Sequence, residues 1–213
     1  MTGAANTLVR GAMVGFAIAA PVGPIGLLCI RRTLTQGVGV GVASGVGAAT
    51  ADALYGLLSA LGLSALSAVL VEQTVVLRMI GGLLLAWLGI SALRQAINDD
   101  TTIVARDAGR SGGNLTTAFG STFVLTLANP MTILSFAGIV AALASPGDTS
   151  ASIALIVGVF AGSVMWWLLL VGGVSVARRS LPSSSLRWIE AASGVALFLF
   201  GGYAMLAGIG RVL

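Results

Sequence analysis

Long apolar stretches separated by short polar segments run through the whole chain. A helix needs about 20 mostly apolar residues to span the hydrocarbon core of a bilayer. The fourth stretch is longer than a bilayer requires, so we expect it to tilt, break or extend beyond the membrane. The pattern predicts an all-α membrane protein with six transmembrane helices, at residues 8–30, 38–62, 76–96, 115–144, 152–177 and 188–210.

The composition agrees with a surface that mostly faces lipid. Of the 213 residues, 57% are hydrophobic and 8% are charged, and the mean hydropathy is +1.02. A soluble domain carries about 25% charged residues, which keep its surface in water. The one sizeable polar segment, 97–114, has the charges and glycines of an exposed loop. We therefore expect a membrane protein and not a soluble enzyme.

The net charge of +4 does not indicate a nucleic-acid partner. Lysine is absent, and no basic run exceeds two residues, as at Arg31-Arg32 and Arg178-Arg179. Each pair follows a long apolar stretch, so we interpret these arginines as anchors that hold helix ends at the lipid headgroups.

Arginines in alternating loops also predict the orientation of the chain, because cytoplasmic loops carry an excess of them. One side of the membrane would hold eight arginines, namely Arg31, Arg32, Arg94, Arg106, Arg110, Arg178, Arg179 and Arg187. The other side would hold three, Arg10, Arg78 and Arg211. We therefore expect both termini to lie outside the cytoplasm and the 97–114 linker to be cytoplasmic.

The two halves of the chain can be laid on each other, three spans on three. Residues 24–28 (PIGLL) match 130–134 (PMTIL), so that Pro24 falls on Pro130. The later spans align Gly47 with Gly158, Asp52 with Ser163, Tyr55 with Trp166, Gly82 with Gly194 and Gly89 with Gly201. We expect one membrane domain made of two three-helix repeats, 1–96 and 115–213. Because each has an odd number of spans, the second repeat would be inverted relative to the first.

The segment Ala20-Pro21-Val22-Gly23-Pro24 lies near the middle of the first span. Proline has no amide hydrogen and clashes with the carbonyl four residues back. Pro21 and Pro24 would therefore release the carbonyls of Ala17 and Ala20, and Gly23 would let the chain bend. Freed carbonyls within a bilayer must be satisfied by protein, water or a ligand. The alternative is a packing kink that binds no ligand.

The fourth span repeats this break at Asn129-Pro130. It also carries four polar residues at helical spacing, which share one face: Thr122, Thr126, Asn129 and Thr132. Thr126 is the residue whose carbonyl Pro130 would release. The threonine hydroxyls could instead bond to their own helix or join neighbouring helices. Asn129, with two donors and an acceptor beside the break, is the stronger candidate for binding a ligand.

Asp52 is the only acidic residue deep within a predicted span, and it lies in a stripe of small residues. A charge at the bilayer centre costs about 2.5–3.5 kcal/mol on insertion scales, and such residues usually mark ion pathways or proton relays. Asp52 could bind an amine, carry a coupling proton, or simply join helices as a neutral or paired carboxyl. Tyr55 follows one turn later, opposite Trp166 in the repeat, whereas we expect Glu190 to be interfacial.

Cysteine and histidine usage limits the possible chemistry. Cys29 is the single cysteine and histidine is absent, so the chain can form no intrachain disulfide and lacks the commonest transition-metal ligand. An intramembrane protease would need a second membrane acid or a base such as histidine. We expect no cofactor, no metal site and no enzymatic activity.

The chain resembles the LysE/RhtB family of bacterial amino-acid exporters. The matching features are Pro21-Val22-Gly23-Pro24, Arg31, Gly37, the Gly45–Asp52 stretch, the Gly81–Gly89 helix and Asn129-Pro130. Where the family often has glycine before its membrane aspartate, this chain has Ala51. The resemblance implies secondary-active export of an amino acid or a related small metabolite across the inner membrane, by a homodimer. Both termini would then be periplasmic.

These observations give one leading hypothesis. The substrate site lies at the midplane between the two broken helices, and we expect it to involve Pro21, Gly23, Pro24, Asp52, Tyr55, Thr126, Asn129, Pro130 and Trp166, with Asp52 as the proton-coupling candidate. The main alternative is a small-cation or metal exporter of the same superfamily that uses Asp52, Asn129 and backbone oxygens. A structural membrane subunit would leave the paired prolines and Asp52 without a purpose.

Overall fold

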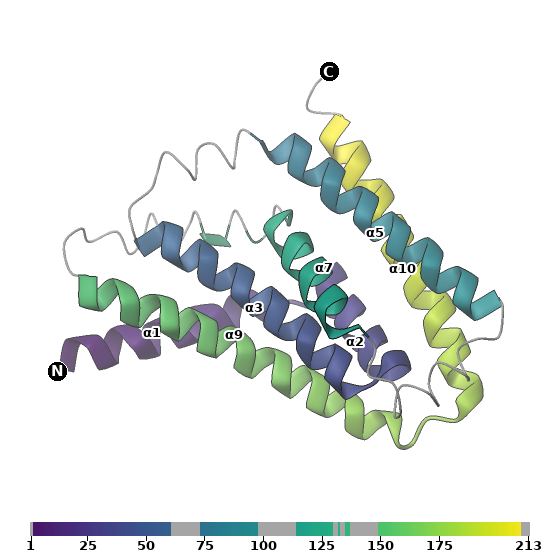
Figure 1. The fold of residues 1–213 in the computed structure, drawn as a ribbon, viewed down its shortest axis with the longest axis horizontal. Coiled ribbons are helices and arrows are strands. Elements are labelled where there is room, and N and C mark those ends of the chain that lie inside the picture. Colours follow the sequence, from purple (N-terminus) through teal and green to yellow (C-terminus); the bar gives the residue numbers. More distant parts are fainter. Residues whose placement is uncertain are drawn as a thin grey trace.

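The computed structural model describes residues 2–60, 73–97, 114–129, 132, 135–136 and 149–209. Every regular element in these ranges is an α-helix (Figure 1). The helices are α1 (Thr2–Ala19), α2 (Pro24–Gln36), α3 (Val38–Ala60), α5 (Thr74–Ile97), α7 (Leu115–Leu127), α9 (Thr149–Arg178) and α10 (Ser183–Ile209).

The helix lengths confirm a multi-pass membrane protein. Four helices, α3, α5, α9 and α10, are long and apolar enough to cross a bilayer. The pair α1 and α2 adds a fifth candidate span if the two are taken together. The helix α7 has 13 residues and covers the first part of the expected fourth span, whose remainder lies largely outside the described residues. The six-span prediction therefore stays a prediction.

The expected break in the first span is confirmed, and it is larger than a kink. The chain leaves α1 at Ala19 and starts α2 at Pro24, and the two helices are bent by 82°. Proline suits the first position of a helix, where no intrahelical N–H bond is needed. The chain then turns from α2 into α3 at Gly37, whose φ of 99° strongly favours glycine.

The helices pack in two groups around α2 and α7 (Figure 1). On one side α1 packs along α9, and α3 packs against both α9 and α7. On the other side α5 and α10 lie along each other. The helix α2 contacts α3, α9 and α10, so it joins the two groups. Its buried Leu28 and Cys29 belong to a shared apolar core with Ala48, Leu88 and Leu197.

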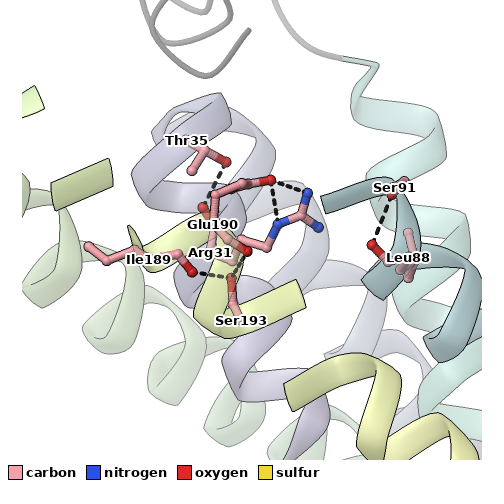
Figure 2. A network of polar contacts seen from close by, with 7 residues as sticks. All are labelled: Arg31, Thr35, Leu88, Ser91, Ile189, Glu190 and Ser193. Carbon is pink, nitrogen blue, oxygen red and sulfur yellow. Dashed lines mark hydrogen bonds and ion pairs between the residues drawn. The ribbon is translucent and has the colours of Figure 1, made fainter. Parts of the chain in front are cut away.

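An ion pair between Arg31 of α2 and Glu190 of α10 fixes this junction (Figure 2). Arg31 Nε donates to Glu190 Oε1 at 2.8 Å, and Arg31 Nη2 donates to the same oxygen. The two side chains are 2% and 0% exposed. Our interpretation of Arg31 as a headgroup anchor and of Glu190 as interfacial is therefore wrong. The bend before α2 carries Arg31 into the bundle, where it needs an acidic partner.

Arg32 is also buried, and its partners are neutral. Its Nη1 donates to Ser44 Oγ at 2.9 Å, Thr122 Oγ1 at 2.9 Å and the Ala118 carbonyl at 3.1 Å, while Nη2 donates to Ser121 Oγ at 2.8 Å. These groups belong to α3 and α7, so the guanidinium joins α2 to both helices. The headgroup interpretation is wrong for this arginine as well.

Small residues let α5 and α10 approach closely. A Cβ built on Gly201 would lie 2.5 Å from the Gly82 carbonyl oxygen, and one on Gly89 would lie 2.7 Å from that of Gly194. Real Cβ atoms essentially never come so near. Glycine at these positions is therefore required by the backbone-to-backbone packing of the two helices.

We expect Gly201→Ala to destabilise the protein by about 1–3 kcal/mol, because the added methyl group must push two helix backbones apart. Gly202→Ala is the matched control, since nothing lies within 4 Å of a Cβ at Gly202. Thermal unfolding of the purified proteins in detergent compares them. Equal melting temperatures for the two variants would contradict the close packing.

A second test addresses the ion pair. Arg31→Met or Glu190→Met alone should destabilise by about 3–5 kcal/mol, because each leaves an uncompensated charge inside the bundle. The double variant should be more stable than either single one, since it removes both charges. Arg179→Met, at an exposed position, is the control. A double variant whose loss equals the sum of the single losses would contradict the pairing.

Candidate functional site

A cavity of about 290 Å³ lies where the start of α2 meets the end of α7. Its walls come from four helices: the start of α2, the end of α7, and facing turns of α5 and α10. The lining residues are Pro24 and Ile25; Leu125, Ala128 and Asn129; Arg78, Gly81, Gly82 and Leu85; and Phe200, Tyr203, Ala204 and Ala207. The structure thus brings Pro24 and Asn129, which are far apart in the sequence, to one cavity.

Two helix ends bring backbone polar groups to this cavity, namely the N–H groups at the start of α2 and the C=O groups at the end of α7. The N-terminus of α2 has no side-chain cap, and Leu27 N donates to the Gly23 carbonyl at 3.0 Å. At the end of α7, Asn129 N donates to the Thr126 carbonyl at 3.2 Å. The carbonyl that Pro130 cannot bond is therefore satisfied within the chain. A helix N-terminus attracts anions and a C-terminus attracts cations.

Arg78 is the one charged side chain among the described residues that line the cavity. Its Nη1 donates to the Ala207 carbonyl of α10 at 3.1 Å, while its Nε is buried without a partner. Sequence reasoning assigned Arg78 only to a loop end. Its position early in a predicted apolar span, three residues before a Gly-Gly pair, was the signal available, and that signal alone does not separate an interfacial arginine from a site residue.

Asp52 lies apart from the cavity, in the contact between α3 and α9. It is 3% exposed, and its Oδ2 accepts a hydrogen bond from Ser163 Oγ at 2.7 Å. Within the part of the chain that the structure describes, Arg31 pairs with Glu190 and no arginine pairs with Asp52. Because a hydroxyl can donate to a carboxylate or accept from a carboxylic acid, Ser163 suits both forms of Asp52.

Tyr55 connects this region to the cavity wall. Its hydroxyl donates to the Leu127 carbonyl at 2.6 Å, and its ring stacks on Phe136 with centroids 5.4 Å apart. Leu127 is the last residue of α7, two positions before Asn129. The helix that carries Asp52 is therefore bonded directly to the helix end that lines the cavity.

The other expected site residues lie elsewhere. Trp166 meets Phe16 of α1 edge to face, with centroids 5.3 Å apart. The Thr126 hydroxyl bonds its own helix, donating to the Thr122 carbonyl at 2.9 Å. Pro21 is exposed and Gly23 is half-buried in the break between α1 and α2. Pro130 lies outside the described residues.

Comparison with known proteins identifies the family. Residues 16–208 match the family model described as LysE type translocator. The chain is 30% identical over 212 residues to the "Putative amino acid efflux protein YcgF" of Bacillus subtilis, covering 98% of this chain and 99% of that protein. It is 31% identical over 198 residues to the "Chemotactic transduction protein ChpE" of Pseudomonas aeruginosa, covering 91% of this chain and 94% of that protein. No solved structure matches.

The family match spans most of the chain and agrees with the resemblance seen in the sequence. The chain therefore belongs to the LysE type translocator family, whose members are transporters and not enzymes.

Proposed function

We propose that this LysE type translocator is a secondary-active exporter of an amino acid or a related small metabolite across the bacterial inner membrane. The observation that carries the proposal is the cavity at which the start of α2 meets the end of α7, lined by Pro24 and Asn129. Interrupted helices that point their ends at one cavity are a common way for transporters to build a substrate site. The efflux activity in the name of the Bacillus relative agrees with this assignment.

A zwitterion matches the two helix ends at this cavity. The amides at the start of α2 favour a carboxylate, and the carbonyls at the end of α7 favour an ammonium group. Asn129 supplies a side-chain amide in the same wall. In this proposal Pro21 and Gly23 shape the turn that aims α2, and Pro130 ends α7. Tyr55 holds the end of α7 against α3, and Thr126 bonds within α7.

We also propose that the fold is a pair of inverted three-helix repeats, 1–96 and 115–213, joined by the 97–114 linker. Helix contacts support this arrangement. When each residue of a contact is replaced by its counterpart in the other repeat, the result is a second contact that is also observed. The contact of Gly82 with Gly201 becomes that of Gly194 with Gly89, and both occur. The packing of α1 on α9 likewise becomes that of α7 on α3.

The equivalence of the repeats bears on Asp52 and Trp166. Asp52 bonds Ser163, its own counterpart, as expected of residues near a pseudo-two-fold axis. Tyr55 contacts α7 and its counterpart Trp166 contacts α1, which are equivalent helices. In this proposal, rocking of one repeat against the other alternates access, and protonation of Asp52 at the repeat interface couples the motion to the proton gradient.

Orientation and assembly complete the proposal. Six spans would place both termini on the same side of the membrane, and the arginine bias favours the periplasm as that side. The working assembly is a homodimer.

Export is tested directly in cells that overproduce the protein. Cells loaded with dipeptides should release one class of amino acid faster than empty-vector cells, and collapse of the proton gradient should abolish the difference. The measurement is a time course of amino acids in the medium. A different outcome would favour the small-cation alternative. In that outcome the protein is present in the membrane, no amino acid accumulates in the medium, and the cells become more tolerant of metal ions.

The coupling role of Asp52 is tested with Asp52→Asn, which keeps the shape of the side chain and removes its titration. We expect export driven by the proton gradient to fall at least about tenfold, and the remaining rate to lose its pH dependence. Ser163→Ala is the matched control, because it removes the hydrogen bond and keeps the carboxyl group. Normal, pH-dependent export by Asp52→Asn would rule out the coupling role.

A further inference from the structure

Arg78 has the wrong surroundings for an arginine that only anchors a helix end. An anchoring arginine extends its charged group into water or lipid headgroups. Here the Nε atom is buried without a hydrogen-bond partner, and Nη1 is held by the Ala207 carbonyl. The side chain borders a cavity whose other walls are mostly apolar. The planar set of donors of a guanidinium in such a place is suited to bind an anion.

We infer that Arg78 binds the carboxylate of the transported molecule, together with the amides at the start of α2 that border the same cavity, and that the apolar walls of this cavity select an aliphatic side chain. The inference rests on the proposed export function and names its substrate class, small neutral aliphatic amino acids. An arginine fork holds a carboxylate through two parallel N–H···O bonds, which fixes orientation as well as position.

The walls support the second part of the inference. Leu85, Leu125 and Phe200 line the cavity, and none of the described residues that line it is acidic. A basic side chain on the substrate would enter this space without a counter-charge, which is costly in a low-dielectric site. An acidic side chain would bring a second anion to a single arginine. The volume of about 290 Å³ is near the lower end of the range for small-molecule sites.

Contacts of Arg78 with α10 give it a link to the helix packing. The Ala207 carbonyl belongs to the last turns of α10. A Cβ built on the next residue, Gly208, would lie 3.7 Å from the Arg78 Cβ, so the two helices are in contact here. Arg78 is thus held by α10 while it borders the cavity. A carboxylate bound there would join α5 to α10 through the substrate.

The test uses the purified full chain in proteoliposomes that exchange labelled leucine for internal leucine. Unlabelled leucine and leucinamide, which lacks the carboxylate, compete for exchange. We expect the wild-type protein to prefer leucine over leucinamide by about tenfold or more, because a hydrogen bond to a charged group is lost. In Arg78→Gln the preference should fall to about twofold or less.

Arg94→Gln is the matched control, since Arg94 lies on the same helix and is exposed. It should keep the wild-type preference. If Arg78→Gln does not exchange leucine, calorimetric binding of the two compounds to the purified protein replaces the exchange assay. If Arg78→Gln does not fold, Arg78→Lys takes its place, because it retains the charge but not the fork. Its preference for leucine over leucinamide should lie between that of the wild type and that expected of Arg78→Gln.

Ala204→Leu tests the wall by filling the cavity. It should shift the preference from leucine toward alanine, whereas Ala192→Leu, at an exposed position of the same helix, should leave it unchanged. Wild-type protein that exchanges amino acids but binds leucinamide as well as leucine would overturn the role of Arg78. So would an unchanged preference in Arg78→Gln. Preferred exchange of arginine or glutamate would overturn the aliphatic selectivity, and absence of all amino-acid exchange would instead contradict the proposed function.

Discussion

The two prolines of the first span impose the constraint on which the rest of the packing depends. Pro21 and Pro24 have no backbone N–H to donate, so the helix that ends at Ala19 restarts at Pro24 in a new direction, turned by 82°. An unbroken helix would carry the following arginines along its own axis toward the membrane surface. The bend instead directs α2 into the bundle, in contact with α3, α9 and α10. Its N-terminus then borders the cavity.

Placing α2 inside the bundle also decides what its arginines must bind. A buried unpaired charge costs several kcal/mol, so each guanidinium needs partners within the protein. Glu190 of α10 supplies the partner of Arg31, and hydroxyls and a carbonyl of α3 and α7 supply those of Arg32. These partners lie far from α2 in the sequence. The guanidinium groups of Arg31 and Arg32 make α2 costly to bury. The same two groups bind α2 to both halves of the chain.

The sequence predicts local features of this fold better than its long-range contacts. Apolar length gave the helices α3, α5, α9 and α10 within a few residues, and the proline rule gave the break after Ala19. The small residues around Asp52 predicted close packing, and Gly45 indeed abuts the Trp167 side chain. Burial of Arg31 and Glu190 could not be predicted in this way, because it depends on the 82° turn and on which helix meets α2. The cavity depends on the same contacts, so Arg78 was not recognised as lining it.

The packing of α5 on α10 bears on how such a cavity could change during transport. Gly82 belongs both to the tight contact with Gly201 and to the cavity wall. Backbones in such close contact cannot approach further, so these helices are expected to move as a unit or to slide along their seam. The α2 and α7 ends face this unit across the cavity and are tied to the other helices by Arg32 and Tyr55. In the proposed transport cycle, motion between the two groups would widen or close the cavity while leaving each group's internal contacts intact. Such motion would have to turn about or break the Arg31–Glu190 ion pair, which joins α2 to α10.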